Sequence, residues 1–408
     1  MANVLVAGGA GAVGRFAVRT LARHEAFDAV VLADIDAARA AEVAAEAGGK
    51  VRAVGLDAGD AAAVAAAAEG CAVVLNCAGP FYRFGRPVLE GAVRARADYV
   101  DVCDDVDATL DLLSMDPLVR DAGLCALIGM GNSPGVTNLL ARFASDQLLD
   151  SVEAVDIYHA HGGEPFEGEG VVAHRLHGMQ MEIPMFLDGE LRHVRFFEPD
   201  GIALRERTGF HKVGRDVPVY PYPHPEQVTI PRHMKVRRVT NRGTVLPDQY
   251  FELTCEVARL GLARHDAVAV RGTPVTAHDF TVAWLLRRRD EILRETAFGS
   301  QRGCAKVVVR GLRRGLPRCY VFSMASQSQA LGEGTGIPAA MGAILMRQGK
   351  VEGKGVQPPE ACVNPVDFLA LVPEVLGSAG AAGGGAFEGV IVEKVDEHGN
   401  VERVDIPM

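Results

Sequence analysis

The sequence predicts an α/β protein with a doubly wound parallel sheet, joined to a second α+β domain built on a mostly antiparallel sheet. The chain opens on a buried strand, a glycine-rich turn and a helix, and apolar strand-like runs then alternate with Ala-rich helices as far as residue 130. Beyond residue 138, Pro-rich stretches and runs of period two replace this alternation, which indicates antiparallel strands joined by turns.

Length and composition restrict the class of protein. With 408 residues, 48% of them hydrophobic, the chain is long enough for two or three domains with a sizeable core. A net charge of −10 does not favour nucleic acid or an anionic membrane as a partner. The sequence contains no apolar run of about eighteen residues and no signal segment, and its eight cysteines form no C-x-x-C pair. We therefore expect a cytoplasmic protein with reduced, buried thiols.

The first element carries the clearest motif. Residues 4–7 form an apolar strand that leads into a G-x-G-x-x-G turn, and helical spacing follows. We expect Gly9 to permit the tight turn, Gly11 to let the backbone approach a pyrophosphate, and Gly14 to let the helix pack against the strand. The helix start offers unpaired N–H groups and a positive dipole end to phosphate. The motif predicts a bound NAD-type dinucleotide, held by Gly9, Ala10, Gly11, Ala12, Val13 and Gly14.

The second strand ends in an acid. Residues 30–33 are apolar, and Asp34 follows Gly14 by 20 residues. A carboxylate here accepts hydrogen bonds from the ribose hydroxyls and repels a 2′-phosphate. We therefore expect NAD as the cofactor, with NADP possible because Arg39 begins the next helix. The turn and this acid together indicate a Rossmann fold, and a third strand over residues 51–57 brings Asp57 to the adenine edge.

The fourth strand, residues 72–76, ends in a loop at the ligand-binding edge. Ligands bind at the carboxyl ends of the strands in an open parallel sheet. We expect a helix over residues 87–96 and place residues 77–82 in the loop before it. This assigns Cys77, Ala78, Gly79 and Pro80 to the cofactor, and Phe81 and Tyr82 to the substrate.

Proton transfer needs a side chain whose pKa lies near the working pH. Asp101 and Asp104 leave the fifth strand (residues 99–105) at the ligand edge, where either can steer an amine or take its proton. The alternative is a pair of surface acids that cap the next helix. His174 and His177 share one face if residues 170–182 are helical, and we assign His177 as the acid or base. The alternative for this pair is a half-buried position with no chemical role.

Other histidines and arginines lead to weaker predictions. His159 and His161 alternate along a strand, as two metal ligands would, but no third ligand of suitable spacing stands near, so we expect no metal. A substrate carboxylate is expected to bind an arginine, whose planar fork contacts both oxygens. The sequence does not choose among the arginines of the second domain, which are Arg205, Arg207, Arg237, Arg238 and Arg242.

The later segments complete the predicted domain organisation. The glycine-rich residues 332–338 open a helix over 339–348, with Pro in its first turn, and we place this helix back against the first domain. The dinucleotide-binding domain then spans residues 1–135, completed by about 332–375. Residues 136–331 form the substrate, catalytic and dimerisation domain, with strands over 152–158, 249–257, 306–309 and 319–324.

The C-terminal part is predicted to be a linker followed by a hairpin. Residues 376–408 include the small and flexible stretch 378–385. Two strands, 390–395 and 401–406, follow it and are joined through a short polar turn.

Several segments resemble the saccharopine dehydrogenase family. They are the opening glycine turn and residues 76–81, 99–101, 129–138, 334–344 and 355–359. The resemblance implies a two-domain, NAD(P)-dependent oxidoreductase that acts on the C–N bond of an amino acid or carboxylated polyamine, between amine and imine, usually as a homodimer. It also implies that the catalytic domain interrupts the dinucleotide domain. The residues that it assigns to the substrate are Ser133, Thr137 and Asn138.

The sequence departs from the family at two of these positions. Saccharopine reductases and carboxynorspermidine dehydrogenases carry an acid directly before the Pro-Gly pair, where this chain has Ser133, and the reductases carry a His where it has Asn138. Saccharopine itself is therefore an unsafe substrate assignment. Two alternatives stay open: a dinucleotide-binding sensor or structural protein without turnover, and a carbonyl or enoyl reductase on the same fold.

Overall fold

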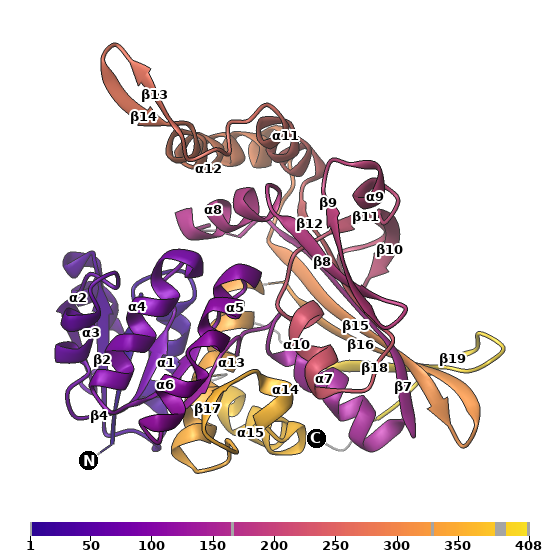
Figure 1. Ribbon diagram of the computed structural model, residues 1–408, viewed down its shortest axis with the longest axis horizontal. Coiled ribbons are helices and arrows are strands. Elements are labelled where there is room, and N and C mark those ends of the chain that lie inside the picture. The colour runs from indigo at the N-terminus through magenta and orange to yellow at the C-terminus, as the bar shows by residue number, and fades with distance from the viewer. Residues whose placement is uncertain (1, 165–166, 328–329, 380–388, 406–408) are drawn as a thin grey trace.

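The protein consists of two domains that lie side by side (Figure 1). The computed structural model describes residues 2–164, 167–327, 330–379 and 389–405. The first domain is a seven-stranded, fully parallel sheet in the order β17-β6-β5-β4-β1-β2-β3, which confirms the doubly wound Rossmann prediction. Its strands are β1 (Asn3–Ala7), β2 (Ala29–Asp34), β3 (Val51–Gly55), β4 (Cys71–Asn76), β5 (Asp98–Asp101), β6 (Cys125–Leu127) and β17 (Gly355–Gln357).

Helices cover both faces of this sheet. In one layer α1 contacts α2 and α13, and in the other α4 contacts α3 and α5. The central strands are buried on both faces, which explains why their sequences are continuous apolar runs without alternation. The helices of the first domain are α1 (Gly14–Arg23), α2 (Ala37–Ala47), α3 (Ala61–Ala67), α4 (Phe81–Arg94), α5 (Val106–Ser114), α6 (Asp116–Asp121), α13 (Ala330–Arg347), α14 (Pro359–Cys362) and α15 (Pro365–Ala379).

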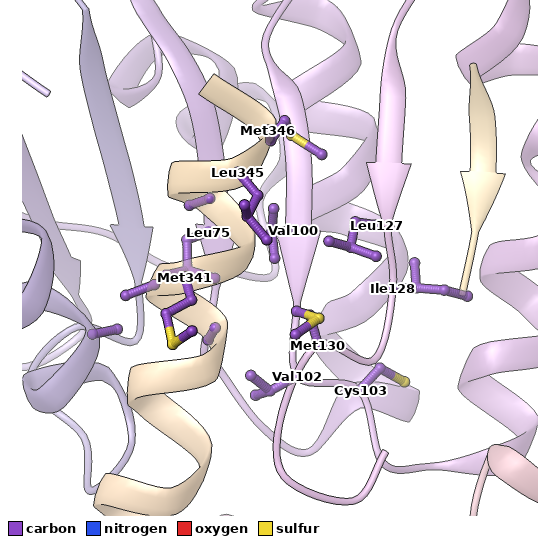
Figure 2. Packing of buried hydrophobic residues seen from close by; sticks show 14 of the residues in the cluster. Leu75, Val100, Val102, Cys103, Leu127, Ile128, Met130, Met341, Leu345 and Met346 are labelled. Carbon is purple, nitrogen blue, oxygen red and sulfur yellow. The ribbon is translucent and has the colours of Figure 1, made fainter. Parts of the chain in front are cut away.

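Helix α13 returns from the distant C-terminal part of the chain to cover the middle of the first sheet. Figure 2 shows Met341 and Leu345 of α13 over Leu75 of β4 and Val100 of β5, and all four side chains are buried. Burial of each such side chain contributes about 1.5–3 kcal/mol. The sheet therefore depends on residues more than 200 positions apart in the sequence.

The predicted start of α13 is wrong. The helix begins at Ala330, so that residues 332–338 lie inside it rather than in a loop before it. A Cβ on Gly332 would lie 2.6 Å from the Ala12 carbonyl oxygen, and one on Gly336 would lie 2.4 Å from that of Val13. These glycines therefore allow close packing of α13 on the segment that begins α1.

Helix α4 also begins earlier than predicted. Phe81 and Tyr82 lie in its first turn rather than in a loop. The Asp105 Oδ2 atom accepts hydrogen bonds from the Phe81 N–H (2.9 Å) and the Tyr82 N–H (3.3 Å), which satisfies two of the free donors of the helix start. The capping acid comes from 24 residues away, so no local signal marks this helix start.

The second domain is a ten-stranded sheet in which β12 and β7 run parallel and the other pairs antiparallel. The main path runs β10-β11-β12-β7-β15-β16-β18-β19, with β8 and β9 attached to β12. Its strands are β7 (Ser151–Gly162), β8 (Glu182–Leu187), β9 (Glu190–Arg195), β10 (Glu206–Phe210), β11 (Gly214–Pro221), β12 (Arg238–Leu246), β15 (Arg302–Arg313), β16 (Leu316–Ser326), β18 (Ile391–Val395) and β19 (Val401–Arg403).

One predicted strand of this domain is a helix. Residues 249–257 belong to α11 (Asp248–Arg259). The buried residues Tyr250, Phe251, Thr254 and Val257 follow helical spacing, and this pattern outweighs the period of two that suggested a strand. The other helices of the domain are α7 (Val136–Phe143), the π-helix η1 (Ala144–Leu148), α8 (Glu169–Gly178), α9 (Pro199–Ile202), α10 (Glu226–His233) and α12 (Ala277–Glu295).

Strands β18 and β19 form a C-terminal hairpin with Val395 opposite Val401, and β18 extends the second sheet beside β16. In the linker predicted over 378–385, residues 378 and 379 end α15, and the rest lies outside the described residues. All eight cysteines are free thiols. Among the described residues, no helix has the length and apolarity that crossing a membrane would require.

Candidate active site

A cavity of about 650 Å³ lies at the carboxyl ends of the first sheet and extends to the second domain. It opens beside β1 and β4, where the strand order reverses and where ligands bind in open α/β sheets. Of the residues that the sequence predicted to contact cofactor or substrate, or to transfer protons, the lining includes Gly11, Ala12, Val13, Asp34, Asp57, Cys77, Ala78, Gly79, Pro80, Phe81, Asp104 and Ser133.

The glycine-rich turn differs from the prediction in one detail. Gly8, not Gly9, has the left-handed conformation (φ 69°), and a Cβ there would lie 2.7 Å from the backbone nitrogen of Ala78. Gly9 gives room to the Leu32 side chain instead. A Cβ on Gly14 would lie 2.1 Å from the Gly8 carbonyl oxygen, so this glycine permits the close strand-to-helix contact that was expected.

The turn has the features that a pyrophosphate requires. Within the described part of the chain, the N–H groups of Ala12 and Val13 have no hydrogen-bond acceptor, and both residues line the cavity at the start of α1. A Cβ on Gly11 would contact only the Gly8 carbonyl oxygen, at 3.2 Å. Bare donors, a helix start and a turn without side chains fit a dinucleotide phosphate, so the residues of this chain suit the predicted cofactor.

Asp34 and Asp57 lie at the same end of the cavity. Asp34 Oδ2 accepts a hydrogen bond from the Ala10 N–H (3.0 Å), so this carboxylate holds the glycine-rich turn as well as facing the cavity. Asp57 Oδ1 accepts one from the Gly59 N–H (2.8 Å). Arg39 lines the cavity beside Asp34. This end therefore carries both an acceptor for ribose hydroxyls and a cation.

The opposite wall belongs to the second domain and is built from four rings. The His159 ring lies 4.9 Å from Tyr222 and 5.3 Å from His224, and the His174 ring lies 5.9 Å from Tyr222, measured between centroids. All four residues line the cavity. A Cβ on Gly243 of β12 would lie only 1.9 Å from the His159 ring, so the strand needs a glycine here to seat that imidazole.

His174 connects this wall to the first domain. Its Nδ1 lies 2.7 Å from Asp105 Oδ1, and its Nε2 lies 3.7 Å from Asp104 Oδ2. Burial opposes the charged imidazole, but the two carboxylates outweigh it and raise the pKa of His174 to about 9. Burial raises the pKa of Asp104, and the neighbouring His174 opposes that shift. The helix α8 therefore presents a charged imidazolium to the cavity near neutral pH.

Arg175 is the arginine of the second domain that lines the cavity. It is almost fully buried, forms an ion pair with Glu167, and lies 5.3 Å from the centre of the Tyr250 ring. Its Nη1 atom has no hydrogen-bond partner among the described residues. None of the five arginines proposed from the sequence lines the cavity. They hold other contacts, as in Arg238 with Asp156 and Arg207 with Asp216.

Ser133 lies at the edge of the cavity beside a buried carboxylate. Its Oγ donates a hydrogen bond to Glu226 Oε1 (2.5 Å), and Thr137 Oγ1 donates to the same oxygen (2.8 Å). Glu226 belongs to α10 and lies 3.4 Å from His224 Nδ1, which lowers the pKa of the carboxyl despite its burial. A carboxylate from a distant element thus lies next to the position where related proteins carry an acid in the turn itself.

Eight of the residues predicted for the site do not line the cavity. Asp101 is fully buried, and its Oδ1 accepts hydrogen bonds from the N–H groups of Cys103 (3.0 Å) and Gly129 (2.6 Å). Burial raises the pKa of Asp101 to about 6. Its role in the structure is to connect β5 to the segment after β6. The other residues outside the lining are Gly9, Ala10, Gly14, Tyr82, Thr137, Asn138 and His177.

The positions of His174 and His177 on α8 explain why His174 lines the cavity and His177 does not. Three residues along α8, His177 turns toward the outside, where its ring packs at a tilt of 35° against Tyr82 (4.4 Å between centroids) and contacts Asp107 (3.0 Å). Asn138 is buried in α7 and donates a hydrogen bond to Glu360 Oε2 (2.8 Å). Of the paired histidines on β7, His159 faces the cavity, and His161 contacts Glu164 (2.7 Å).

Two groups of side chains have the spacing of metal ligands: Asp104, Asp105 and His174, and Asp105, Asp107 and His177. Asp105 belongs to both. Its carboxylate already accepts hydrogen bonds from His174 and from two backbone N–H groups at the start of α4. The short distances between these side chains are therefore explained by ion pairs between acids of the first domain and histidines of the second.

Sequence reasoning missed most of the second-domain wall. Tyr222 and His224 lie in a Pro-rich stretch that was only predicted to be irregular, although a Tyr and a His between prolines form a signal for a functional loop. Arg175 and Glu167 could not be predicted as site residues, because no local sequence pattern distinguishes a buried arginine from an exposed one.

Comparisons with known proteins agree with this arrangement. The sequence family described as "Saccharopine dehydrogenase NADP binding domain" matches residues 4–127. Carboxyaminopropylagmatine dehydrogenase of Synechocystis sp. is 24% identical over 92% of this chain and 96% of that protein, and carboxynorspermidine synthase of Vibrio alginolyticus is 22% identical over 74% of this chain and 75% of its own.

Solved structures extend the comparison to the fold. Apo saccharopine dehydrogenase (L-Glu forming) from Saccharomyces cerevisiae matches with a TM-score of 0.65 at 16% identity, over 92% of this chain and 98% of that one. The shared fold therefore includes both domains. These findings confirm the resemblance seen in the sequence: residues 4–127 match the saccharopine dehydrogenase NADP-binding domain family, and the fold of the whole chain is similar to that of saccharopine dehydrogenase.

Proposed function

We propose that this NAD(P)-dependent oxidoreductase acts on the C–N bond of an amino acid or a carboxylated polyamine, between amine and imine. The observation that carries the proposal is one continuous cavity with a dinucleotide turn at one end and the Arg175, His174 and Asp104 side chains at the other. When bound, the nicotinamide supplies the acceptor or donor of hydride, and the chain's own residues bind the substrate and move its proton.

Arg175 supports a substrate that carries a carboxylate. Its guanidinium is buried at the cavity wall, Glu167 occupies one of its nitrogens, and Nη1 has no partner within the described residues. A buried donor left without an acceptor costs about 1–3 kcal/mol, which a carboxylate bound at this point would recover. The relatives whose names include a carboxy group and a polyamine support the same class of substrate.

Acidic side chains support a second, cationic part of the substrate. Asp104, Glu169 and Glu333 line the cavity together with the ring wall. Carboxylates and aromatic faces both attract an ammonium or guanidinium group. A molecule with a carboxylate at Arg175 and a protonated amine near these acids fits this distribution of charge.

The cofactor choice follows from Asp34 and Arg39. Asp34 favours free ribose hydroxyls, so we propose NAD as the preferred cofactor, and Arg39 gives NADP a contact for its additional phosphate. Steady-state assays with both reduced cofactors should give a lower KM for NADH than for NADPH. A clear preference for NADPH would contradict this assignment.

We further propose a cytoplasmic homodimer. The cytoplasmic placement is supported by the eight free thiols. The homodimer is supported by exposed apolar residues on the arm formed by α11, α12 and the hairpin of β13 (Ala267–Val270) and β14 (Thr273–Thr276), which projects from the body in Figure 1. Those residues are Leu260, Val268, Val270, Phe280 and Trp284.

The proposed reaction is tested by a substrate panel. The protein is mixed with NAD or NADP and with carboxyalkylated amines, matched amines that lack the carboxylate, and carbonyl compounds with the reduced cofactor. We expect reduced cofactor to appear with carboxylated secondary amines and not with their decarboxylated counterparts. Tight dinucleotide binding without turnover would instead support a sensor, and turnover of carbonyl compounds alone would support a carbonyl reductase.

A further inference from the structure

We propose that His174 exchanges the proton with the substrate nitrogen and that Asp105, which belongs to the other domain, orients it, so that the acid–base group exists only when the two domains are together. The proposal rests on the proposed function and adds the residues that perform its proton step. Asp101, Asp104 and His177, the residues that the sequence suggested, do not have this geometry.

The contacts of Asp105 fix the orientation of the imidazole. Its Oδ1 lies 2.7 Å from His174 Nδ1, and because a carboxylate only accepts, Nδ1 carries the donated proton. Its Oδ2 accepts from the backbone of Phe81 and Tyr82, so the acid cannot rotate away. The Nε2 atom of His174 is therefore left for the cavity, with Asp104 Oδ2 at 3.7 Å.

The two partners come from different domains. Asp105 directly precedes α5 of the first domain, beside the loop 77–80 that lines the cofactor end, whereas His174 lies on α8 of the second domain. Both side chains are buried. An imidazole held by a buried carboxylate is the arrangement that selects one tautomer and stabilises the charged form after proton uptake.

The proton step balances without a further reagent. In the oxidative direction the C–H hydrogen leaves the carbon as hydride with both electrons, which the oxidised nicotinamide would accept. The nitrogen lone pair forms the C=N bond, and the N–H proton passes to Nε2 of the neutral form of His174. In the reductive direction the imidazolium returns that proton to the nitrogen. Solvent re-equilibrates the imidazole between turnovers.

The groups that face His174 set its titration. They are the carboxylates of Asp104 and Asp105 from the first domain, Arg175 on α8 itself, His159 on β7, and Tyr222 and His224 from the segment after β11. The two acids raise its pKa, and Arg175 and burial oppose them. Loss of one carboxylate must therefore move the pKa of His174 to a lower value.

The chain contains a matched control in a second Asp–His pair. Asp107 and His177 lie two and three residues further along the same two segments and are in contact at 3.0 Å. This pair is partly exposed and does not line the cavity. Asp107→Asn removes a carboxylate beside an imidazole, as Asp105→Asn does, but at a place away from the proposed chemistry.

The experiment compares kcat and its pH profile for the wild type, His174→Gln, Asp105→Asn and Asp107→Asn, with dinucleotide affinity measured by fluorescence of the reduced cofactor. We expect His174→Gln to lose on the order of 100-fold or more in kcat while it retains dinucleotide affinity. In Asp105→Asn, the limb of the profile that rises with pH in amine oxidation should shift to lower pH by about one unit or more. Asp107→Asn should resemble the wild type.

Full activity of His174→Gln, or an Asp105→Asn profile that coincides with that of Asp107→Asn, would overturn the proposal while leaving the proposed function intact. A wild-type protein that oxidises no amine would instead refute the proposed function, and this proposal with it. Retained dinucleotide binding shows that a variant is folded. If His174→Gln does not fold, Asp105→Asn provides an independent test.

Discussion

At the scale of single residues, the substrate end of the cavity depends on a few buried charges. Arg175 pairs with Glu167 and keeps one nitrogen without a partner among the described residues, and Glu226 supports Ser133 and His224 from beneath. Arg175 lines the cavity itself, whereas Glu226 acts on the cavity through Ser133 and His224, which line it. Such groups recognise ligands strongly because water does not screen them.

Arg175→Lys tests the carboxylate contact. Lysine keeps the charge beside Glu167 but loses the planar fork that binds two oxygens. We expect kcat/KM for a carboxylated amine to fall by about 10- to 100-fold, with little change for the matched amine that lacks the carboxylate. The measurement is the ratio of the two kcat/KM values. An equal loss for both substrates would show that Arg175 acts only on the fold.

Glu360 gives a prediction for stability. It is fully buried, accepts a hydrogen bond from Asn138, and burial raises its pKa from 4.5 to about 7. Because the folded state binds this proton more tightly than the unfolded state, its stabilising contribution is complete below pH 4.5 and is lost as the pH rises through 7.

The corresponding experiment is urea unfolding of the wild type and Glu360→Gln between pH 4.5 and 8. Relative to the variant, the wild type should lose on the order of 3 kcal/mol of unfolding free energy across this range. Parallel pH dependence of the two proteins would show that Glu360 titrates normally in the fold.

Where a motif is local, the structure places most of the residues that the sequence singled out in the cavity lining. The cofactor end consists of short segments next to strand ends, so Gly11, Asp34 and the 77–80 loop were found from their neighbours. The ring wall consists of single residues on β7, α8 and the segment after β11, which only tertiary structure brings together. For that reason the sequence selected His177, one helical turn from the residue that faces the cavity.

At the scale of elements, the contact between α1 and α13 positions the dinucleotide turn. The glycines of α13 lie against the backbone of Ala12 and Val13, whose N–H groups face the cavity. The sequence placed α13 against the first domain but began it nine residues too late, because Gly and Pro normally mark a helix boundary. Here close packing, not a helix start, requires the glycines.

Gly336→Ala should therefore destabilise the protein, with Gly334→Ala as its control. The added methyl at 336 would lie 2.4 Å from the Val13 carbonyl oxygen, which forces the helices apart at a cost of about 1–3 kcal/mol. At 334 the nearest atom, on Asn132, is 3.6 Å away, and alanine should stabilise the helix by about 0.5–1 kcal/mol. Urea unfolding measures both. Equal effects at the two positions would refute the packing role.

At the scale of the whole molecule, the site lies between the two domains and is complete only with both. The first domain supplies the dinucleotide turn and Asp104 and Asp105, and the second supplies Arg175 and the rings. The fold class could be predicted because strand and helix periods are local. The relation of the domains could not, because it depends on contacts such as that of His174 with Asp105, 69 residues apart.

Binding of a dinucleotide at the turn after β1 is tested by calorimetric titration of the wild type and Gly11→Leu with NAD(H) and NADP(H). We expect micromolar binding by the wild type and loss of measurable binding by the variant, with an unchanged circular dichroism spectrum, because a side chain at Gly11 would occupy the place of the pyrophosphate. Equal affinity of the two proteins, or a wild type that binds neither cofactor, would contradict this expectation.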